Sequence, residues 1–285
     1  MTWFEETLYS GAVSLGYAQK FEVSRVVHRE TTGLQDLVIF DTPTFGRVLA
    51  LDGIIQTTEK DEFAYHEMLA HVPLFSHGRA RRVLIIGGGD GGVLREALRH
   101  PVESVTLVEI DRKVINLCAA HLPSLSNGSF DDPRTHLVIG DGIRFVEETD
   151  ESFDVIIVDS TDPVGPGEAL FSEAFYGACK GCLSAGGILV TQNGVPQFQA
   201  SELTDSDRRL RRHFADVGFY LTVVPTYVGG FMALGWATDD RSLRGQSQAD
   251  LALRYEAAGL VTRYYTPEVH VASFALPPFI SRLLS

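Results

Sequence analysis

The sequence predicts an α/β fold, in which a doubly wound parallel sheet follows a small antiparallel β domain. Two observations support this prediction. From residue 81 onward, short apolar runs alternate with stretches of helical spacing, as in a parallel sheet covered by helices. Before residue 60, apolar and polar residues instead alternate along short β-branched runs. We therefore expect a β domain over residues 1–60 and a larger α/β domain over residues 61–285.

The N-terminal part contains stretches with strand character and one turn signal. Strand character is found at residues 20–30, 35–42 and 46–58. The last of these holds Asp52-Gly53 between two apolar runs, which is typical of a tight β-hairpin. Residues 60–78 then change to helical spacing, and we expect Pro73 to end or kink that helix.

The larger part alternates strands and helices along the chain. Buried strands are expected at residues 81–87, 104–110, 135–141, 153–159 and 187–193. Helices are expected between them at residues 92–100, 112–122, 142–148 and 172–183. Residues 218–228 and 230–240 resemble two consecutive strands around a Gly-Gly turn, so we expect an antiparallel pair to close the sheet.

The net charge of the chain argues against some classes of binding partner. The formal net charge is −13, which argues against nucleic acid or an anionic membrane as the partner. An acidic chain suits a cationic substrate, although acidic residues also serve solubility. The N-terminus lacks the apolar core of a signal peptide, and no apolar run is long enough to span a membrane. We expect a soluble, cytoplasmic protein.

A glycine-rich loop lies between a predicted strand and a predicted helix. Its residues Gly87, Gly89 and Gly92 have the spacing of a Rossmann-type nucleotide loop, whose backbone approaches a ligand closely. Glu109 lies at the end of the next predicted strand, about 20 residues after the glycine loop. A carboxylate at this position of a Rossmann-type fold accepts hydrogen bonds from both ribose hydroxyls. We therefore expect an adenosine-like ligand. The alternative is that Glu109 is merely a solvated strand end.

Asp90, within this loop, argues against a dinucleotide. A carboxylate beside a pyrophosphate would be strongly repelled in a low-dielectric cleft. An S-adenosyl ligand fits better, because it carries a sulfonium and no phosphate, and a tail with a bare ammonium would pair with Asp90. Asp141 and Gly142, after another strand, are candidates for binding the adenine. The alternative for both aspartates is a turn or helix cap.

A second acidic pair follows the strand at residues 153–159. Asp159 ends that strand, where open α/β sheets place their chemistry, and Asp162 follows it closely. Two carboxylates there suit an ammonium substrate, and a carboxylate whose pKa is raised by its neighbours is a candidate general base. The alternative for Asp162 is an Asx turn before Pro163. The Pro/Gly-rich residues 163–167 form either a lid or a rigid loop.

Other motifs carry no chemistry in our interpretation. His66 and His71 are five residues apart, whereas the helical zinc motif needs a spacing of four. Cys179 and Cys182 fall in a predicted helix without a second cysteine pair, so we expect packing rather than a redox or metal role. The basic residues 208–214 are interpreted as a solvated helix face. We expect no metal site.

Several stretches together resemble the polyamine aminopropyltransferases, in particular the bacterial spermidine synthases. They span nearly the whole chain and are LDGIIQTTEKDEFAYHEMLAHVPL, VLIIGGGDGGVLREALRH, VEID, DDPR, DGIRFV, FDVIIVDSTDPVGPGEALF and PTYVGGFMALGWATD. The resemblance implies a Rossmann-like domain of the AdoMet-methyltransferase type after a small N-terminal β domain. It implies transfer of an aminopropyl group from decarboxylated S-adenosylmethionine, a co-substrate, to putrescine, giving spermidine and methylthioadenosine. It implies no cofactor and no metal.

The resemblance also implies roles for individual residues. Asp159 would accept the proton, Asp90 would hold the aminopropyl ammonium, and Glu109 would bind the ribose. Donor binding would further involve Gln35, Gly87, Gly89, Asp141, Gly142 and Pro166. Acceptor binding would involve Tyr65, His66, Asp90, Asp159, Asp162 and Tyr227. A homodimer or homotetramer is the expected assembly.

The same residues leave alternatives open. Cadaverine, agmatine or spermidine as acceptor would need only small changes in pocket length. An amine N-methyltransferase using intact S-adenosylmethionine would share the nucleoside residues. A non-catalytic polyamine-binding protein would keep Asp90 and Asp162 but release no methylthioadenosine. The presence of Asp159 together with all the predicted nucleoside-binding residues favours an enzyme over a binding protein.

Overall fold

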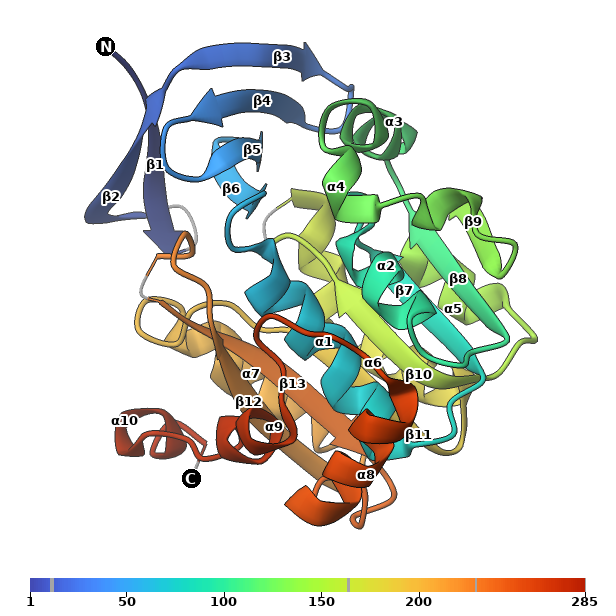
Figure 1. Cartoon of the computed structure of the whole chain (residues 1–285). Helices are drawn as coiled ribbons and strands as arrows, with labels where there is room; N and C mark the ends of the chain where they lie inside the picture. Colours follow the sequence, from blue (N-terminus) through green and yellow to red (C-terminus); the bar gives the residue numbers. More distant parts are fainter. Residues whose placement is uncertain (11–12, 163–164, 229, 285) are drawn as a thin grey trace.

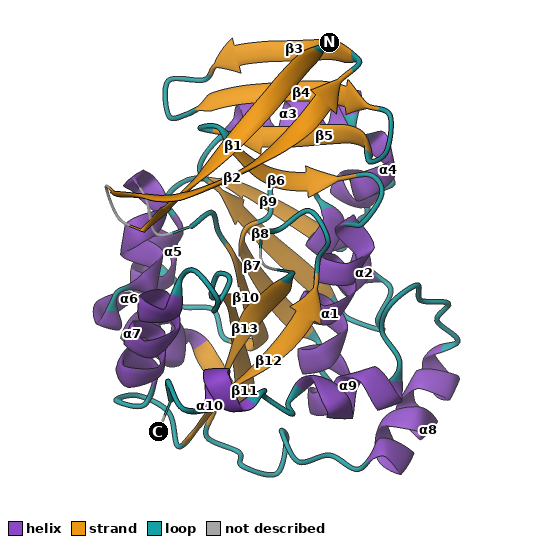
Figure 2. Ribbon diagram, turned by 90° about the vertical axis from the view of Figure 1, so that its left-hand side faces the viewer, coloured by secondary structure: helices purple, strands orange, loops and turns teal. Residues whose placement is uncertain are grey.

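The structure is a computed structural model, and it describes residues 1–10, 13–162, 165–228 and 230–284 (Figure 1). A β-rich N-terminal part sits at one end of a larger α/β part, whose sheet has helices on both faces (Figure 2). The α/β fold predicted from the sequence is therefore confirmed. Within the described ranges, no helix is long and apolar enough to cross a membrane.

The N-terminal part consists, as far as it is described, of a long hairpin and a four-stranded antiparallel sheet. The hairpin strands are β1 (Thr2–Ser10) and β2 (Val13–Val23), and the sheet strands are β3 (Arg25–Thr31), β4 (Asp36–Thr42), β5 (Gly46–Leu51) and β6 (Ile54–Thr58). Between β5 and β6, Asp52 and Gly53 have φ angles of 49° and 81°, as the predicted tight turn requires. The domain boundary at residue 60 follows β6 and stays a prediction.

The larger part is built on a sheet ordered β12-β13-β11-β10-β7-β8-β9. Its parallel strands are β7 (Arg82–Gly87), β8 (Ser104–Glu109), β9 (Thr135–Ile139), β10 (Phe153–Asp159) and β11 (Leu183–Gln192). The last two strands, β12 (Asp216–Val223) and β13 (Phe231–Thr238), pair antiparallel, and β13 also runs antiparallel to β11. The predicted antiparallel closure is thus confirmed, while Gly229 of the predicted Gly-Gly turn lies outside the described residues.

Helices cover both faces of this sheet (Figure 2). They are α1 (Glu62–His77), α2 (Gly92–Leu98), α3 (Arg112–His121), α4 (Pro123–Ser126), α5 (Gly142–Glu148), α6 (Glu173–Cys182), α7 (Ala200–Leu210), α8 (Gln248–Ala258), α9 (Pro267–Ser273) and α10 (Pro278–Ser281), with 3-10 turns η1 (Ser129–Asp131) and η2 (Gly165–Phe171). On β7, Val83 and Ile85 share a core with α1 and α2, whereas Leu84 and Ile86 share a core with α5 and α6. Burial on both faces explains why these strands are continuous apolar runs.

The two parts of the chain are joined by an apolar interface. Leu37 and Leu49 of the N-terminal sheet pack in one core with Val114 of α3 and Leu125 of α4. These contacts bring the N-terminal sheet over the same edge of the larger sheet at which β8 ends.

We expected Pro73 to end or kink the helix, and the first of these alternatives is wrong because α1 continues past Pro73 to His77. The helix is buried along nearly its whole length, and two hydroxyl groups of β12 donate to its carbonyl oxygens. Thr222 Oγ1 donates to Ala64 O at 2.6 Å, and Tyr220 OH donates to Met68 O at 3.1 Å. Tertiary packing therefore outweighs the helical hydrogen bond that a proline cannot donate.

The structure contradicts part of the interpretation of residues 208–214 and agrees with that of the two cysteines of α6. Helix α7 ends at Leu210, so the interpretation of residues 208–214 as one solvated helix face is wrong in its second half, where Phe214 is buried. Cys179 and Cys182 are free and buried in α6, within the core that α6 shares with the sheet. Their surroundings agree with a packing role.

Candidate active site

The strand order reverses between β7 and β10, which makes this edge the switch point of the sheet. From β7 the sheet continues to β8 and β9 on one side, and through β10 to β11 on the other. Asp159, the last residue of β10, pairs in register with Gly87, the last residue of β7. Ligands of open α/β sheets bind in the crevice outside such strand ends.

A cavity of about 830 Å³ opens at this edge and extends from the N-terminal sheet to α7. It brings together nearly all the site residues predicted from the sequence, namely Gln35, Tyr65, His66, Gly87, Gly89, Asp90, Glu109, Asp141, Gly142, Asp159, Asp162 and Tyr227. Pro166 belongs to η2 by its backbone, and its side chain lies outside what the structure describes. Residues 163–164, on which the lid and the Asx turn depend, also lie outside it.

The first glycine of the loop is required by a close contact with β10. Gly87 has a φ of 81°, and a β-carbon at this position would lie 2.1 Å from the carbonyl oxygen of Asp159. The backbone N–H of Gly88 donates to that same oxygen at 3.0 Å. The glycine loop and the aspartate at the end of β10 are therefore in direct contact, although they are far apart in the sequence.

One end of the cavity carries the groups expected to bind a nucleoside. Glu109 is 7% exposed, so it is not a solvated strand end, and its Oε1 accepts from the Asp111 N–H at 2.8 Å. Burial, with the nearby Asp111 charge, raises the pKa of Glu109 to about 7. Gln35 of the N-terminal part donates to Asp111 Oδ2 at 3.2 Å. Asp141 is exposed and caps α5, where it accepts from the Ile143 N–H at 2.8 Å.

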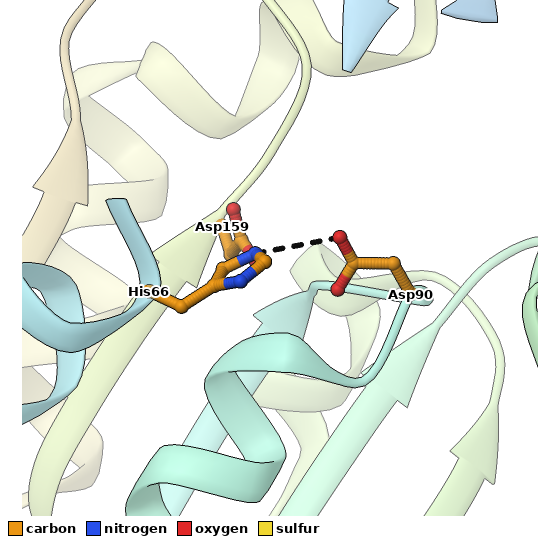
Figure 3. Close-up of side chains that lie close together, drawn as sticks. All are labelled: His66, Asp90 and Asp159. Carbon is orange, nitrogen blue, oxygen red and sulfur yellow. Dashed lines mark ion pairs between the residues drawn. The ribbon is translucent and has the colours of Figure 1, made fainter. Parts of the chain in front are cut away.

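Asp90 faces a buried histidine on α1 (Figure 3). His66 Nε2 lies 3.4 Å from Asp90 Oδ2, and His66 Nδ1 lies 2.6 Å from Glu62 Oε2. Burial by itself lowers the pKa of His66, but the two carboxylates outweigh it and raise that pKa to about 10. Burial opposes ionisation of Asp90 too, yet the imidazolium holds its pKa below the ordinary value. The other Asp90 oxygen accepts from the Gly92 N–H at 2.7 Å, so Asp90 also satisfies the start of α2.

Asp159 is held by a tyrosine on α1. The Tyr65 hydroxyl donates to Asp159 Oδ1 at 2.8 Å. Burial and the charge of Asp90 raise the pKa of Asp159 to about 6, against the opposing effects of His66 and Tyr65. Burial and Asp159 raise the pKa of Tyr65 well above its ordinary value, so the phenol stays a neutral donor. A carboxylate with such a pKa is mostly ionised at neutral pH and accepts a proton more readily than an ordinary one.

Asp162 and Tyr227 also line the cavity. Gln199 Nε2 donates to Asp162 Oδ2 at 2.9 Å, and burial raises the pKa of Asp162. The ring of Tyr227 meets that of Tyr65 edge-on, with centroids 5.7 Å apart. The Tyr227 hydroxyl donates to the carbonyl oxygen of Gln56 at 2.6 Å. Burial raises the pKa of Tyr227 well above its ordinary value, and the charges of Asp159 and Asp90 raise it further.

Sequence reasoning missed several polar residues of the cavity, among them Glu6, Gln192, Gln199 and Glu202. Glu6 of β1 is buried and accepts from the Ile55 N–H at 3.1 Å, and burial raises its pKa to about 7. Gln192 is the last residue of β11, so the strand-end rule that selected Asp159 would also have selected it. Glu6 carries no such signal, because the N-terminal hairpin brings it to the cavity only in three dimensions.

Three side chains converge near the glycine loop in a way that suits a cation (Figure 3). His66, Asp90 and Asp159 each place a potential ligand atom within 4.8 Å of the others. With a pKa of about 10, His66 carries a proton at neutral pH, and a metal ion would have to displace this proton before it could bind the imidazole. Two carboxylates and one imidazolium leave a single negative charge. That balance suits one ammonium group better than a divalent metal ion.

Comparison with known protein families finds matches in both parts of the chain. Residues 62–246 match the Spermine/spermidine synthase domain. Residues 2–59 match the Spermidine synthase tetramerisation domain. The two matches divide the chain at the same place as the end of β6 and the start of α1.

Individual relatives agree with the family match. The chain is 54% identical to the polyamine aminopropyltransferase of Salmonella schwarzengrund (strain CVM19633) and 53% identical to that of Salmonella newport (strain SL254), over 99% of both chains in each case. A spermidine synthase in complex with the transition state analogue AdoDATO superposes with a TM-score of 0.92 at 40% identity. The spermidine synthase from Thermotoga maritima superposes with a TM-score of 0.89 at 38% identity. Each superposition covers 99% of this chain and 94% of the other. The chain therefore belongs to the spermidine synthase family of polyamine aminopropyltransferases, as its sequence motifs predict.

Proposed function

We propose that the chain transfers the aminopropyl group of decarboxylated S-adenosylmethionine to putrescine, giving spermidine and methylthioadenosine. The observation that carries the proposal is one cavity with a nucleoside edge at Glu109 and three carboxylates beyond it, Asp90, Asp159 and Asp162. A related spermidine synthase forms a complex with the transition state analogue AdoDATO, which supports the same reaction here.

The donor lies along the glycine loop. Glu109 accepts hydrogen bonds from the ribose hydroxyls, and the donor's ammonium pairs with Asp90. Gln35, Asp141 and Gly142 contribute to the nucleoside pocket. Intact S-adenosylmethionine carries an α-carboxylate that would lie against Asp90, so like charges disfavour it.

The acceptor lies on the side of Asp159 and Asp162. Its reacting nitrogen binds beside Asp159 and the Tyr65 hydroxyl, and its second nitrogen binds at Asp162 and Tyr227. An alkylammonium has a pKa near 10, so the reacting nitrogen must lose a proton before it attacks. Asp159, with its pKa of about 6, accepts that proton.

The chemical step is a direct displacement. The neutral amine nitrogen attacks the aminopropyl carbon next to the sulfonium, and the carbon–nitrogen bond forms as the carbon–sulfur bond breaks. The bonding electrons go to sulfur, which leaves as the neutral thioether of methylthioadenosine. The sulfonium is already a good leaving group. The protein therefore needs to supply only the alignment of the two substrates and a base.

A mass-spectrometric assay tests the proposal. The enzyme is incubated with decarboxylated or intact S-adenosylmethionine and a panel of putrescine, cadaverine, agmatine and spermidine. We expect aminopropyl addition, methylthioadenosine release and the highest kcat/KM with putrescine. Methyl addition from the intact donor would overturn aminopropyl transfer. Another amine with the highest kcat/KM would replace putrescine as the acceptor.

We also infer that the chain forms a homodimer or homotetramer through its N-terminal part. That part matches a tetramerisation domain and exposes large apolar side chains on its strands. Trp3, Tyr17 and Val26 are 52%, 48% and 53% exposed. Light scattering after gel filtration gives the mass directly, and a monomeric mass at micromolar concentration would contradict the inference.

A further inference from the structure

The ring of His66 is enclosed by α1, by the glycine loop and by the start of α2. A β-carbon at Gly92 would lie 2.2 Å from the Cε1 and Nδ1 atoms of His66, so the ring packs directly on the backbone where α2 begins. The Nδ1 atom of the ring faces Glu62 Oε2 at 2.6 Å, and its Nε2 atom faces Asp90 Oδ2 at 3.4 Å. The imidazole is therefore held between two carboxylates that belong to different elements.

Glu62 is itself held by an arginine of α2. Arg95 Nη2 donates to the same Glu62 Oε2 atom at 2.8 Å. The rest of the guanidinium is fixed, because its Nε donates to Glu96 Oε1 at 2.8 Å and its Nη1 donates to the Leu125 carbonyl oxygen at 2.6 Å. Burial opposes ionisation of Glu62, but His66 and Arg95 outweigh it and hold the pKa of Glu62 below the ordinary value. Glu62 is therefore a charged group of fixed position.

The pair formed by His66 and Asp90 can hold one proton in two ways. With the proton on the imidazole both groups are charged, and with the proton on the carboxyl group both are neutral. Burial favours the neutral arrangement. Asp159 of β10 attracts the imidazolium but repels the charged form of Asp90, so its two effects oppose each other. The charge of Glu62 favours the imidazolium and that of Arg95 favours the charged carboxylate, so these two residues select the charged arrangement.

We propose that Glu62 and Arg95 are positioning residues for the donor. They hold His66 with its Nε2 toward Asp90, so that Asp90 stays charged and faces the aminopropyl ammonium. The proposal rests on the proposed function, in which Asp90 pairs with that ammonium. His66 and Asp90 line the cavity, whereas, among the described residues, Glu62 and Arg95 do not. An effect of either residue on the donor must therefore pass through the residues in between.

Two ligands that differ in charge test the proposal in the full-length protein. The Kd values of decarboxylated S-adenosylmethionine and of methylthioadenosine, which lacks the ammonium, are measured by calorimetry in the wild type and in Glu62→Gln. This change keeps the size of the side chain and removes its charge. We expect the ratio of the donor Kd to the methylthioadenosine Kd to rise roughly 10-fold. An unchanged or lower ratio, including an equal loss of affinity for both ligands, would overturn the proposal.

Glu67→Gln is the matched control. Glu67 is also buried on α1, but its carboxylate accepts from the backbone N–H groups of Arg263, Tyr264 and Tyr265. The control thus removes a buried charge from the same helix without touching the contacts of His66, and thermal unfolding checks that each variant is folded. We expect the ratio of the two Kd values to stay unchanged. The same rise as in Glu62→Gln would reject a specific role for Glu62.

A double-mutant cycle tests the contribution of Arg95. The ratio of the two Kd values is measured for Arg95→Met in the wild-type background and in the Glu62→Gln background. We expect Arg95→Met to raise the ratio in the first background and to add little in the second, because the guanidinium acts mainly by supporting Glu62. Additive effects would show that Arg95 does not act through Glu62 and would overturn its part of the proposal.

The charge of His66 gives a readout that does not depend on the donor. Nuclear magnetic resonance of protein with isotope-labelled histidines follows the titration of each imidazole, and loss of a signal in His66→Gln identifies His66. We expect His66 to titrate near pH 10 in the wild type and roughly one pH unit lower, or further, in Glu62→Gln. The same titration in both proteins would reject the proposal. Failure of the proposed function is distinguishable, because no amine would then yield methylthioadenosine while this difference in titration would persist.

Discussion

The hydroxyl of Tyr65 donates a 2.8 Å hydrogen bond to Oδ1 of Asp159, across 94 positions of sequence. The bond fixes one oxygen of the carboxylate and favours its charged form. Burial and the charge of Asp90 act in the opposite direction and raise the pKa of Asp159 to about 6. This balance gives the carboxylate a fixed orientation and a basicity between those of a free aspartate and a histidine.

Replacing Asp159 with asparagine removes the base while keeping the size of the side chain. We expect kcat to fall roughly 10²- to 10⁴-fold, the range of general base catalysis. Methylthioadenosine binding, measured by calorimetry, is expected to survive because Glu109 and the glycine loop are unchanged. Turnover close to the wild type would remove Asp159 from the role of base.

The pH dependence of donor use reports two carboxyl groups. Glu109 and Asp159, with pKa values of about 7 and about 6, are both raised, so each gains its proton as the pH falls. In the proposed function both must be ionised, Glu109 to accept from the ribose and Asp159 to act as base. We expect kcat/KM for the donor to fall roughly 10-fold per pH unit just below neutrality and roughly 100-fold per unit below pH 6. If the plot of log kcat/KM against pH never becomes steeper than one log unit per pH unit, the assignment of two titrating groups is wrong.

Replacing Tyr65 with phenylalanine removes the hydroxyl that favours the charged form of Asp159. The pKa of Asp159 then rises, and the lower limb of the kcat profile moves to higher pH. We expect a larger loss of kcat at acidic than at alkaline pH, measured at saturating donor and putrescine. A uniform loss at every pH would assign Tyr65 to binding geometry alone.

Asp90 is expected to set the choice between the two possible donors. Replacing Asp90 with alanine removes the carboxylate that, in the proposed function, pairs with the donor's ammonium and repels an α-carboxylate. We expect binding of decarboxylated S-adenosylmethionine to weaken roughly 10- to 100-fold relative to the intact compound. Competition between the two compounds measures this ratio. Unchanged affinity for the decarboxylated donor would refute the role given to the glycine loop.

Removal of divalent metal ions is expected to leave activity unchanged. The side chains of His66, Asp90 and Asp159 together carry one negative charge when the imidazole is protonated, as its pKa of about 10 indicates. One ammonium group would balance this charge. Dialysis against EDTA, followed by assay with and without added Mg²⁺ or Zn²⁺, measures the effect. A loss of turnover that one metal restores would contradict the prediction of a metal-independent reaction.

Residues at strand ends were predictable, because two sequence patterns coincide there. A continuous apolar run identifies a strand buried on both faces, and the carboxyl ends of such strands meet at one edge of the sheet. Glu109, Asp159 and the glycine loop were all selected by this reasoning, and the structure brings them into one cavity. Gln192 has the same position on β11 and was overlooked, although the same rule applies to it.

Two acidic residues that tertiary docking brings to the cavity were not predicted. Glu6 lies inside a strand of the N-terminal hairpin, and Glu202 lies on α7, a helix that the sequence analysis did not define. Neither position has a local pattern that distinguishes it from an ordinary acidic residue. The expected helix end at Pro73 was wrong for a similar reason, because the burial of α1 by other elements is not visible in its own sequence.

The hydrogen bond between Tyr227 and Gln56 has a consequence for the order of events during folding. These residues are 171 positions apart, and a contact of such range must overcome a large loop-closure entropy before it forms. The helices and the parallel strands need only shorter-range contacts. During refolding, helical circular dichroism should therefore recover before turnover does, because the acceptor side of the cavity is completed only when the N-terminal part docks.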